Sequence, residues 1–570
     1  MSDEYYQFST CDVYWLSRYG NDPVLLAKIA GDVVAKRSIS RSEESKSGWL
    51  ASDGHSDVFT CSFNKDTQSA VGVFSFVMRA ETRYINVLQP GDLFFIFMSS
   101  VAPSQDSPST LVTVGIADRV TESRQASDGA TTNVLTVIGK DFGKILLETQ
   151  TVFDPAFAQF EQTFFTETFF EKMNDASGGS IGQSSIEMVY SILDLYFNEK
   201  ATKNQVTELQ WRYPGNNSVG LASLINLRDF VQAPLYGYTD QIDLQITSAP
   251  NVHSLCESFC NRVLNEFFID VRDYTQQERE FLKHQEALVS AFVPADDAQR
   301  QRNKRDGVDE AIFGPSFEKE SKSTIALVYR QLPYDSEAFY KLPTHYVKET
   351  EVIGDITFGK SSQEAYNFIR LRIPVLPVET QEFTYGIRIN PGSIASFGLK
   401  RLELETMYGF PDSLLGEGLV EGEAHQDQFI SVYEYYTGIA SVWNACNEHL
   451  LSGSITLRFR PEIRVGTRLS FSFTPVGGKL EILDFYIQSV SHSFNYEPGT
   501  SRTTLILVRG IRNTENIEST DKSSLLTQSM IFNKKGIRIP QEVDPWIRVT
   551  AIGSFEVQGE NVPSISRGIE

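Results

Sequence analysis

Three side chains in one predicted helix could hold a metal ion. His253, Cys256 and Cys260 are spaced at i, i+3 and i+7, which places them on one helical face. Three such side chains can bind zinc when a fourth ligand comes from elsewhere in the chain. Both cysteines, however, also lie on the apolar stripe beside Leu255 and Phe259, where a thiol acts as a small hydrophobe. We therefore expect buried thiols here, with no metal site and no cofactor.

Three further patterns resemble catalytic motifs but lack their required surroundings. Residues 178–182 (GGSIG) match a nucleophile elbow, which needs a buried strand directly before it, whereas 174–177 are polar or small. Asp141-Phe142-Gly143 spells the magnesium motif of kinases without a glycine-rich phosphate loop or a catalytic loop. His492 has no assignable nucleophile or acidic partner, which predicts a structural histidine. Carboxylate pairs are too common in this acidic chain to single out one pair, so we expect no catalytic residues and no enzyme.

The composition predicts a multidomain globular protein. The chain has 570 residues, with 41% hydrophobic and 12% aromatic residues, enough to fill several cores. The 51 basic and 73 acidic residues give a net charge of −22, which argues against a general nucleic-acid binder. The start lacks a basic and apolar leader, no apolar run is long enough to cross a bilayer, and the five cysteines are scattered. These features predict synthesis in a cytoplasm with reduced thiols.

The elements that would position any site are clearest in residues 453–510. Ile455, Leu457 and Phe459 alternate with polar residues, which predicts a half-buried strand. Three more apolar runs follow, separated by breaks rich in glycine and proline. The side pattern of the third run slips near Gln488, which indicates a β-bulge. The sequence therefore predicts a small antiparallel barrel.

A similar series begins at residue 71. Phe74, Phe76 and Met78 alternate with less apolar residues, and 93–98 is apolar enough to be buried on both faces. Strands are expected at 111–120 and 133–138, joined by a polar loop over 121–132 with Asp128-Gly129 at its turn.

The two series share one order of strands and glycine turns. In that order 90–93 corresponds to 464–467, 111–120 to 485–494, and 134–139 to 505–510. One explanation is an internal duplication of one barrel. The other is that any two antiparallel barrels share this order, and the pattern alone leaves both open.

The remaining segments are read more coarsely. Asn251 is expected to cap a helix that ends near Asn265 and runs into a strand at 267–271. The other expectations are a helix at 24–30, helices at 153–173 and 184–198, a charged loop at 294–323, a strand at 324–330, a short helix at 441–451, a linker at 511–540 and a final strand at 546–557.

An ordered set of short motifs carries a family resemblance. In the second barrel these are Gly453-Ser454-Ile455, Arg464-Val465-Gly466, Phe485-Tyr486-Ile487, Val490-Ser491-His492-Ser493-Phe494, Thr503-Thr504-Leu505 and Arg509-Gly510. Upstream they are Gly91-Asp92, Ile138-Gly139-Lys140-Asp141, Asn265-Glu266 with Asp270 and Arg272, Tyr329-Arg330, Pro333-Tyr334, Glu364 with Tyr366-Asn367, and Phe397-Gly398-Leu399. The set resembles the baseplate hub proteins of tailed bacteriophages, which are related to the hub portion of type VI secretion spikes. It covers residues 71–510 in patches.

The resemblance implies a mixed, β-rich (α+β) fold with two tail-tube-like antiparallel β-barrel domains and α/β insertions. The expected domains are an N-terminal arm with the first barrel (1–150), a helical or mixed insertion (151–250), a helix-strand segment of the second barrel with an insertion domain (251–440), the main strands of the second barrel (441–515) and a C-terminal extension (516–570). No attached lysozyme or peptidase domain is recognisable.

The resemblance also implies a function and partners. Hub proteins form homotrimers in which two barrels per chain make a pseudo-sixfold ring between the tail-tube protein and the central spike protein. Tape-measure and baseplate wedge proteins are further expected partners, the location is the virion tail baseplate, and DNA only passes through the channel. We hypothesise that acidic residues line this channel and repel phosphates, with simple solubility as the other explanation of the charge. The alternative functions are a tail-associated enzyme that degrades host cell wall or surface glycan, and a receptor-binding tail protein.

Overall fold

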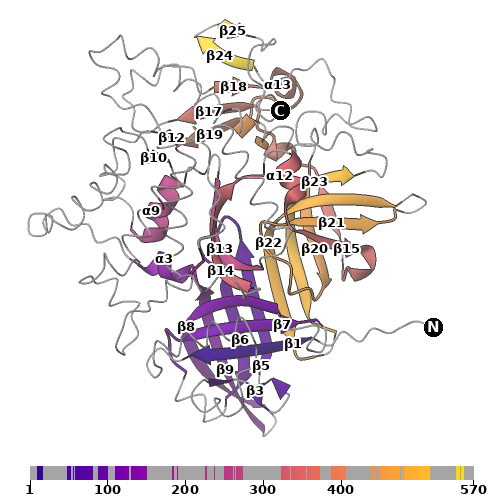
Figure 1. The fold of residues 1–570 in the computed structure, drawn as a ribbon. Coiled ribbons are helices and arrows are strands. Elements are labelled where there is room, and N and C mark those ends of the chain that lie inside the picture. Colours follow the sequence, from indigo (N-terminus) through magenta and orange to yellow (C-terminus); the bar gives the residue numbers. More distant parts are fainter. Residues whose placement is uncertain are drawn as a thin grey trace, which may run out of the picture.

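The computed structural model of the chain is dominated by antiparallel β-sheet (Figure 1). The described ranges that follow contain short gaps of undescribed residues. The structure describes residues 9–16, 48–80, 88–100, 110–149, 250–273, 323–372, 387–405 and 437–513, together with the short strands at 183–184, 225–226, 236–237, 547–551 and 554–556 and the single residue Val189.

The first sheet unit contains the strands drawn in indigo and purple in Figure 1. Its hydrogen-bonded order is β5-β6-β9-β8-β7-β1, and β1 also lies beside β5, so that the unit curves back on itself. The bounds are β1 (Thr10–Leu16), β5 (Val58–Asp66), β6 (Val73–Arg79), β7 (Leu93–Ser99), β8 (Thr110–Ser127) and β9 (Ala130–Asp141).

The second sheet unit has the order β16-β20-β23-β22-β21-β15. Its bounds are β15 (Thr344–Lys348), β16 (Thr357–Gly359), β20 (Leu451–Arg458), β21 (Arg468–Phe473), β22 (Glu481–Asn495) and β23 (Arg502–Asn513). After β15 the chain passes through the 3-10 helix η4 (Glu349–Glu351) to the far edge, where Val352 bridges to Leu457 before β16 pairs with β20. A continuous segment therefore joins both edges and closes a small barrel.

The two units repeat more than the strand order. In the first, the amide of Gly91 donates to Ala117 and the amide of Ala117 donates to Asp92, at 2.8 and 2.9 Å. In the second, Gly466, Ile487 and Thr467 repeat this exchange at the same two distances. Both turn glycines have positive φ, 92° and 68°, and a register shift follows each exchange, which leaves one bulged residue. The shared order with shared local geometry favours the duplication over a generic barrel pattern.

One strand joins the two units into a single 13-stranded sheet. The first half of β22 pairs with β21, whereas its second half pairs with β5 of the first unit, from Ser489 opposite Asp66 to Asn495 opposite Thr60. Alternate residues of these strands point into two apolar cores, one mainly under each unit, and Phe459 and Phe494 of the second unit pack into the core of the first.

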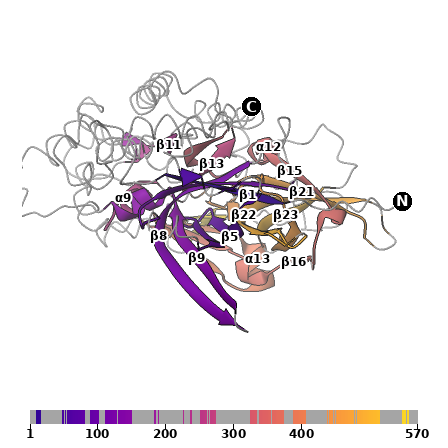
Figure 2. The same cartoon turned by 90° about the horizontal axis from the view of Figure 1, so that it is seen from below.

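The other described elements surround this sheet (Figures 1 and 2). Strands β13 (Asn265–Asp273) and β14 (Ser323–Gln331) pair with each other, and β11 (Ile225–Asn226) pairs with β14. A separate sheet has the order β19-β17-β18-β24-β25. The remaining bounds are β2 (Gly48–Trp49), β3 (Ala51–Ser52), β4 (His55–Ser56), α3 (Lys144–Glu148), β10 (Gln183–Ser184), β12 (Tyr236–Gly237), α9 (Val252–Phe259), α12 (Ser336–Lys341), η5 (Ser362–Glu364), β17 (Phe368–Arg372), β18 (Ile387–Ile389), α13 (Pro391–Phe397), β19 (Arg401–Glu405), β24 (Ile547–Ala551) and β25 (Ser554–Glu556). None of the described helices is long and apolar enough to span a bilayer.

Several sequence expectations are confirmed. Phe74, Phe76 and Met78 are fully buried, and every residue of β7 is buried, as their patterns predict. The register of β22 shifts between Ile487 and Ser489, so the bulge lies at Gln488. The Asn251 side chain caps α9 by accepting from the amide of Ser254 at 2.8 Å.

Other boundaries are wrong. The segment expected as a polar loop at 121–132 is mostly strand, because β8 and β9 continue as a ladder up to Ser127 opposite Ala130. Strands β1 and β5 were missed, α9 ends at Phe259 rather than near Asn265, and Leu451 already belongs to β20. The final strand is a pair, β24 and β25. The expected helices at 24–30 and 153–173, nearly all of the one at 184–198, the loop at 294–323 and the linker beyond Asn513 lie outside the described residues.

The repeated geometry predicts equal sensitivity at two glycines. A methyl group on Gly139 would collide with Phe74, and one on Gly510 would collide with Phe485. We expect Gly139→Ala and Gly510→Ala each to lower the free energy of unfolding by about 1–3 kcal/mol, measured by urea denaturation. Gly359→Ala is the control, since nothing lies within 4 Å of its added methyl group. Equal stability of all three variants would contradict the packing described.

Candidate functional site

A buried polar cluster forms where the hairpin of β13 and β14 meets the Gly466 turn. We call Glu266, Arg272, Arg330, Arg464, Gly466 and Tyr486 the junction cluster. Arg330 forms an ion pair with Glu266 and donates a second hydrogen bond to the carbonyl of Gly466. The Tyr486 hydroxyl donates to the other oxygen of Glu266, and burial, followed by the charge of Glu266, raises the pKa of that tyrosine. The hairpin is thereby tied to both the turn and β22.

Two more arginines fasten the turn from other sides. Arg272 lies 5.3 Å over the Phe268 ring and donates to the carbonyl of Val465 at 2.9 Å. Arg464 donates to the carbonyls of Val112, at 3.2 Å, and Leu111, both on β8 of the first unit. Arginine suits this role because its planar fork reaches several acceptors at once. The cluster therefore links three parts of the chain that are far apart in the sequence.

His492 supports the same turn as a structural side chain. Its Nδ1 lies 3.0 Å from the Thr503 hydroxyl and its Nε2 lies 3.2 Å from the carbonyl of Ile463. Burial lowers its pKa to about 3, so the ring is neutral at neutral pH. The expectation of a satisfied structural histidine is confirmed.

The candidate metal ligands are buried on α9. Cys256 and Cys260 are fully buried free thiols, and burial raises the pKa of both. His253 is 5% exposed, packs against Phe267, and has its pKa lowered by burial to about 4. Among the residues that the structure describes, no group of three or more His, Cys, Asp or Glu could hold a metal ion.

The kinase-like tripeptide has a turn-forming role. Asp141 ends β9, and its buried carboxylate accepts from Lys65 at 2.6 Å and from the amides of Gly72 and Gly143 at 2.7 and 3.0 Å. The Asp141 carboxylate therefore binds groups of the protein itself, as a structural side chain does. The elbow-like residues 178–182 lie outside the described part of the chain.

The outer face of the joined sheet is a second candidate surface, and sequence reasoning missed it. Its side chains alternate with the core residues, so they are exposed or half-buried, and most carry hydroxyl or amide groups. We call this surface the hydroxyl face. Across the six strands β20, β23, β22, β5, β6 and β9 it comprises Ser454, Thr456, Arg458, Arg502, Thr504, Ile506, Ser491, Ser493, Asn495, Thr60, Ser62, Asn64, Asp66, Val73, Ser75, Val77, Val134, Thr136, Ile138 and Lys140.

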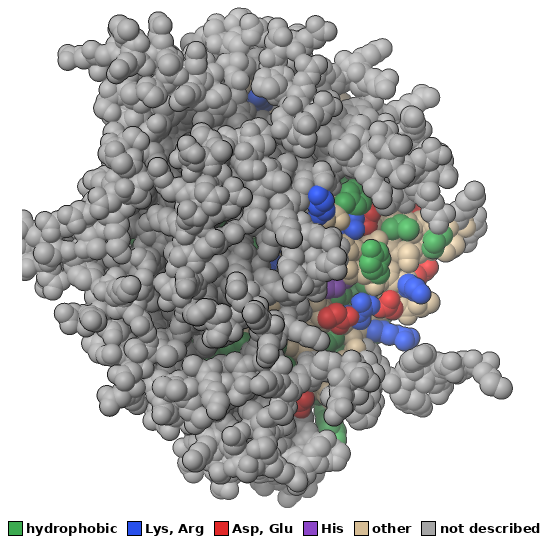
Figure 3. Space-filling model, viewed as in Figure 1, with side chains coloured by type: hydrophobic (Ala, Val, Ile, Leu, Met, Phe, Trp, Pro, Cys, Tyr) green, Lys and Arg blue, Asp and Glu red, His purple; other side chains and the backbone are tan. Residues whose placement is uncertain are grey.

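The described charges elsewhere on the second unit are balanced. Arg460 pairs with both Glu351 and Glu462 beside the exposed Tyr346. Figure 3 shows basic, acidic and hydrophobic side chains intermixed on the right of the molecule, over β15 and β21. This surface and the hydroxyl face therefore do not concentrate the negative charge of the chain.

The junction cluster predicts a large cost for breaking its ion pair. Glu266→Gln leaves the Arg330 charge buried without its carboxylate, and we expect a loss of about 3–5 kcal/mol in the free energy of unfolding. Glu122→Gln breaks an exposed pair with Arg124 and is the control, with an expected loss of under about 1 kcal/mol. Adding Arg330→Met to Glu266→Gln is expected to recover part of the stability. Urea denaturation measures all three, and similar losses in the two single variants would contradict the role of the pair.

The comparisons with known proteins concern structure only. No protein-family model and no curated protein matches the chain. Among solved structures, it is similar to the 43 kDa tail protein of prophage MuSo2 from Shewanella oneidensis, with 9% identity, a TM-score of 0.35, and coverage of 80% of this chain and 94% of that one. It is also similar to the tail protein from Neisseria meningitidis MC58, with 9% identity, a TM-score of 0.37, and coverage of 80% of this chain and 93% of that one. A third similar structure is the E. coli c3393 protein, described as a type VI secretion component with structural similarity to the T4 tail proteins gp27 and gp5. The identity is 8%, the TM-score is 0.33, and the match covers 80% of this chain and 74% of that one.

Proposed function

We propose that the chain is the structural baseplate hub of a phage tail. In this role three copies form a homotrimeric ring that adapts the sixfold tail tube to the threefold central spike and leaves a channel for DNA. The tail-tube protein binds one face of the ring and the spike protein the other, with tape-measure and baseplate wedge proteins as further neighbours. The chain acts as a scaffold, without catalysis, in the virion tail.

The observation that carries this proposal is the repeated sheet unit. Each chain holds two units with one strand order and one turn geometry, fused through β22 and β5 into a single sheet. Three chains would therefore present six similar units around an axis, which is what a sixfold partner requires. Because the units also differ, the same ring keeps threefold character. For example, β1 pairs antiparallel with β7, whereas β15 pairs parallel with β21.

The motif residues support the same function. The resemblance to hub proteins rests partly on Glu266, Arg272, Arg330 and the Arg464-Val465-Gly466 turn, which are separated by up to about two hundred positions in the sequence. In the structure they contact one another within the junction cluster. Motifs that come together in space form a fold signature, which chance matches scattered along the chain would not.

The hydroxyl face suits the wall of a DNA channel. Its charged side chains are Asp66, Lys140 and the arginines Arg458 and Arg502, which lie opposite each other on β20 and β23, and the rest of this six-stranded face is uncharged. Hydroxyl and amide groups keep such a wall hydrated while offering little attraction to phosphates, whose binding depends on clustered cations. We propose this face as the channel lining, in which case weak attraction replaces the repulsive acidic lining that the net charge suggests.

The first expected outcome concerns assembly. Light scattering on the purified full chain is expected to give about three times the chain mass of 64.1 kDa. Electron micrographs of the same sample are expected to show rings with six lobes. A monomer at micromolar concentration, or particles without a central opening, would contradict the hub.

The second concerns the channel. Ser62→Lys with Ser493→Lys adds two adjacent cations to the hydroxyl face beside Arg502, because Ser62 is paired with Ser493 and Ser493 with Arg502. We expect the double variant to stay trimeric and to bind duplex DNA about tenfold more tightly at low salt, measured by fluorescence anisotropy. Ser362→Lys with Ser396→Lys, at exposed positions away from the sheet, is the control. Equal DNA binding by the two double variants would remove this face from the channel.

A further inference from the structure

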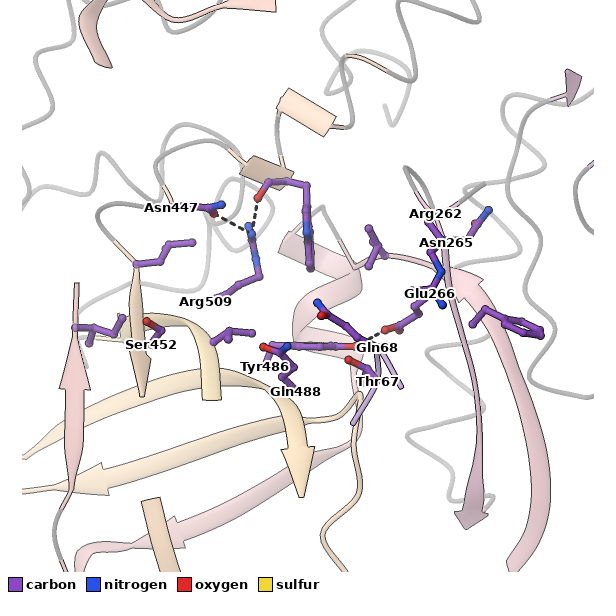
Figure 4. Close-up of a pocket in the computed structure, with 16 residues that line it drawn as sticks. Thr67, Gln68, Arg262, Asn265, Glu266, Asn447, Ser452, Tyr486, Gln488 and Arg509 are labelled. Atoms are coloured by element: carbon purple, nitrogen blue, oxygen red, sulfur yellow. Dashed lines mark hydrogen bonds between the residues drawn. The ribbon is translucent and has the colours of Figure 1, made fainter. Parts of the chain in front are cut away.

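A cavity beside the junction cluster is lined in part by a buried arginine, Arg509. It has a volume of about 370 Å³ and lies between the beginnings of β13 and β20, the middle of β22 and the end of β23 (Figure 4). Gln68, Gln488 and Ser452 place polar side chains on its lining, while Trp443 and Val508 contribute apolar surface. The volume is at the lower end of the range for pockets that hold ligands.

Arg509 is turned into this wall by its backbone. It has φ of 57°, in the left-handed region that side chains other than glycine rarely adopt, where the register between β22 and β23 shifts. Its guanidinium lies 3.9 Å from the centroid of the Trp443 ring. Nη1 donates to the Trp443 carbonyl and to Oδ1 of Asn447 at 3.3 Å. The protein therefore fixes the plane of the guanidinium and uses one of its nitrogens.

The charge of Arg509 has no counter-ion among the described residues. The residue is 9% exposed, and no carboxylate of the described chain forms an ion pair with it. Its Nε is buried without a hydrogen-bond partner there. Burial lowers its pKa to about 9, so it remains charged at neutral pH. Glu266, the acid on the opposite wall, already binds Arg330 and Tyr486.

An uncompensated buried charge costs several kcal/mol, which is why such groups are normally paired. Nη1 is occupied and Nε is fully buried, so Nη2 is the nitrogen of the guanidinium left for a ligand. A charged Nη2 can donate a charge-assisted hydrogen bond to a carboxylate oxygen. A dianionic phosphate fits less well, because Glu266 lies nearby and the second cation of the lining, Arg262, already pairs with Glu257.

We propose that this pocket binds the carboxylate of an acidic side chain presented by a protein partner, with Arg509 as its counter-ion and Trp443 as the plate that holds the guanidinium. The choice of a protein-borne carboxylate rests on the proposed function, because a scaffold of the tail binds other proteins. The carboxylate chemistry itself depends only on the pocket.

The first test adds a carboxylate beside Arg509, whose charge has no counter-ion among the residues that the structure describes. Asn447→Asp converts the amide already 3.3 Å from Nη1 into a carboxylate of nearly the same shape. We expect this variant to melt at a higher temperature than the wild type, by several degrees, whereas Asn64→Asp on the exposed side of β5 leaves the melting temperature unchanged. A lower melting temperature for Asn447→Asp would overturn the claim that Arg509 has no counter-ion among the described residues.

The second test adds a ligand to the full chain. Acetyl-Gly-Glu-Gly-amide is expected to bind at least about tenfold more tightly than acetyl-Gly-Gln-Gly-amide in calorimetric titrations, which corresponds to about 1.4 kcal/mol. Arg509→Gln and Asn447→Asp are expected to abolish this preference, and Arg509→Lys to weaken it because a lysine lacks the planar guanidinium that packs on Trp443. Equal binding of both peptides, or a preference that survives in Arg509→Gln, would overturn the proposal.

Two controls separate the possible failures. Sodium acetate that binds as tightly as the glutamate peptide would assign the pocket to free carboxylates and reject the protein partner. The molar mass of the wild-type particle tests the hub independently, so a trimer without peptide preference rejects only the pocket. If Arg509→Gln does not fold, the melting temperature of Asn447→Asp and its loss of peptide preference still decide the question.

Discussion

The pairing of β22 with β5 is the constraint on which the rest of the structure depends. β22 has 15 residues, long enough to serve β21 with its first half and β5 with its second. The bulge at Gln488 lies between the two halves and accepts the amide of Thr67 at 3.0 Å, just beyond the end of β5. A bulge bends and twists its strand, which lets one strand leave one curved sheet and enter another. The two units are therefore joined by the main-chain hydrogen bonds of the β22 and β5 ladder.

Buried arginines then fix the turn that precedes β21. Arg272 and Arg330 donate hydrogen bonds to the carbonyl groups of Val465 and Gly466 in this turn. Arg464 belongs to the turn itself and donates to the carbonyl of Leu111 on β8. Gly466 is required twice over, by its φ of 68° and because a methyl group there would meet Arg330 and Phe268. The first unit has the same turn at Gly91, but there the carboxylate of Asp92 accepts from the amide of Gln89 at 2.9 Å instead. The repeats thus share a backbone geometry that each stabilises with its own side chains.

The sequence predicts what is local and misses what depends on distant partners. The alternation of Phe74, Phe76 and Met78 and the slipped pattern at Gln488 are written in neighbouring residues, and both were recoverable. Strand β5 also alternates, with Cys61 and Phe63 buried between exposed Ser62 and Asn64, so it carried a usable signal that was overlooked. The end of the β8 and β9 hairpin near its turn carries no such signal, because its residues are mainly polar on both faces of the sheet and form strands through their pairing. The counter-ion state of Arg509 depends on residues 60 or more positions away and has no sequence signature.

The distribution of charge bears on the DNA channel that the proposed ring would enclose. A net charge of −22 invites an account based on repulsion, yet the hydroxyl face contains Asp66 as its acidic member and three basic side chains. Repulsion between acidic side chains and phosphates acts over about 8–10 Å at physiological salt, and it weakens as the ionic strength rises. A hydrated wall with few charges would bind phosphates weakly over most of its area, because phosphate affinity arises from clustered cations and the counter-ions they release. On the hydroxyl face β-sheet alternation itself supplies the polar surface, since the side chains that do not enter a core lie on the opposite side of the sheet.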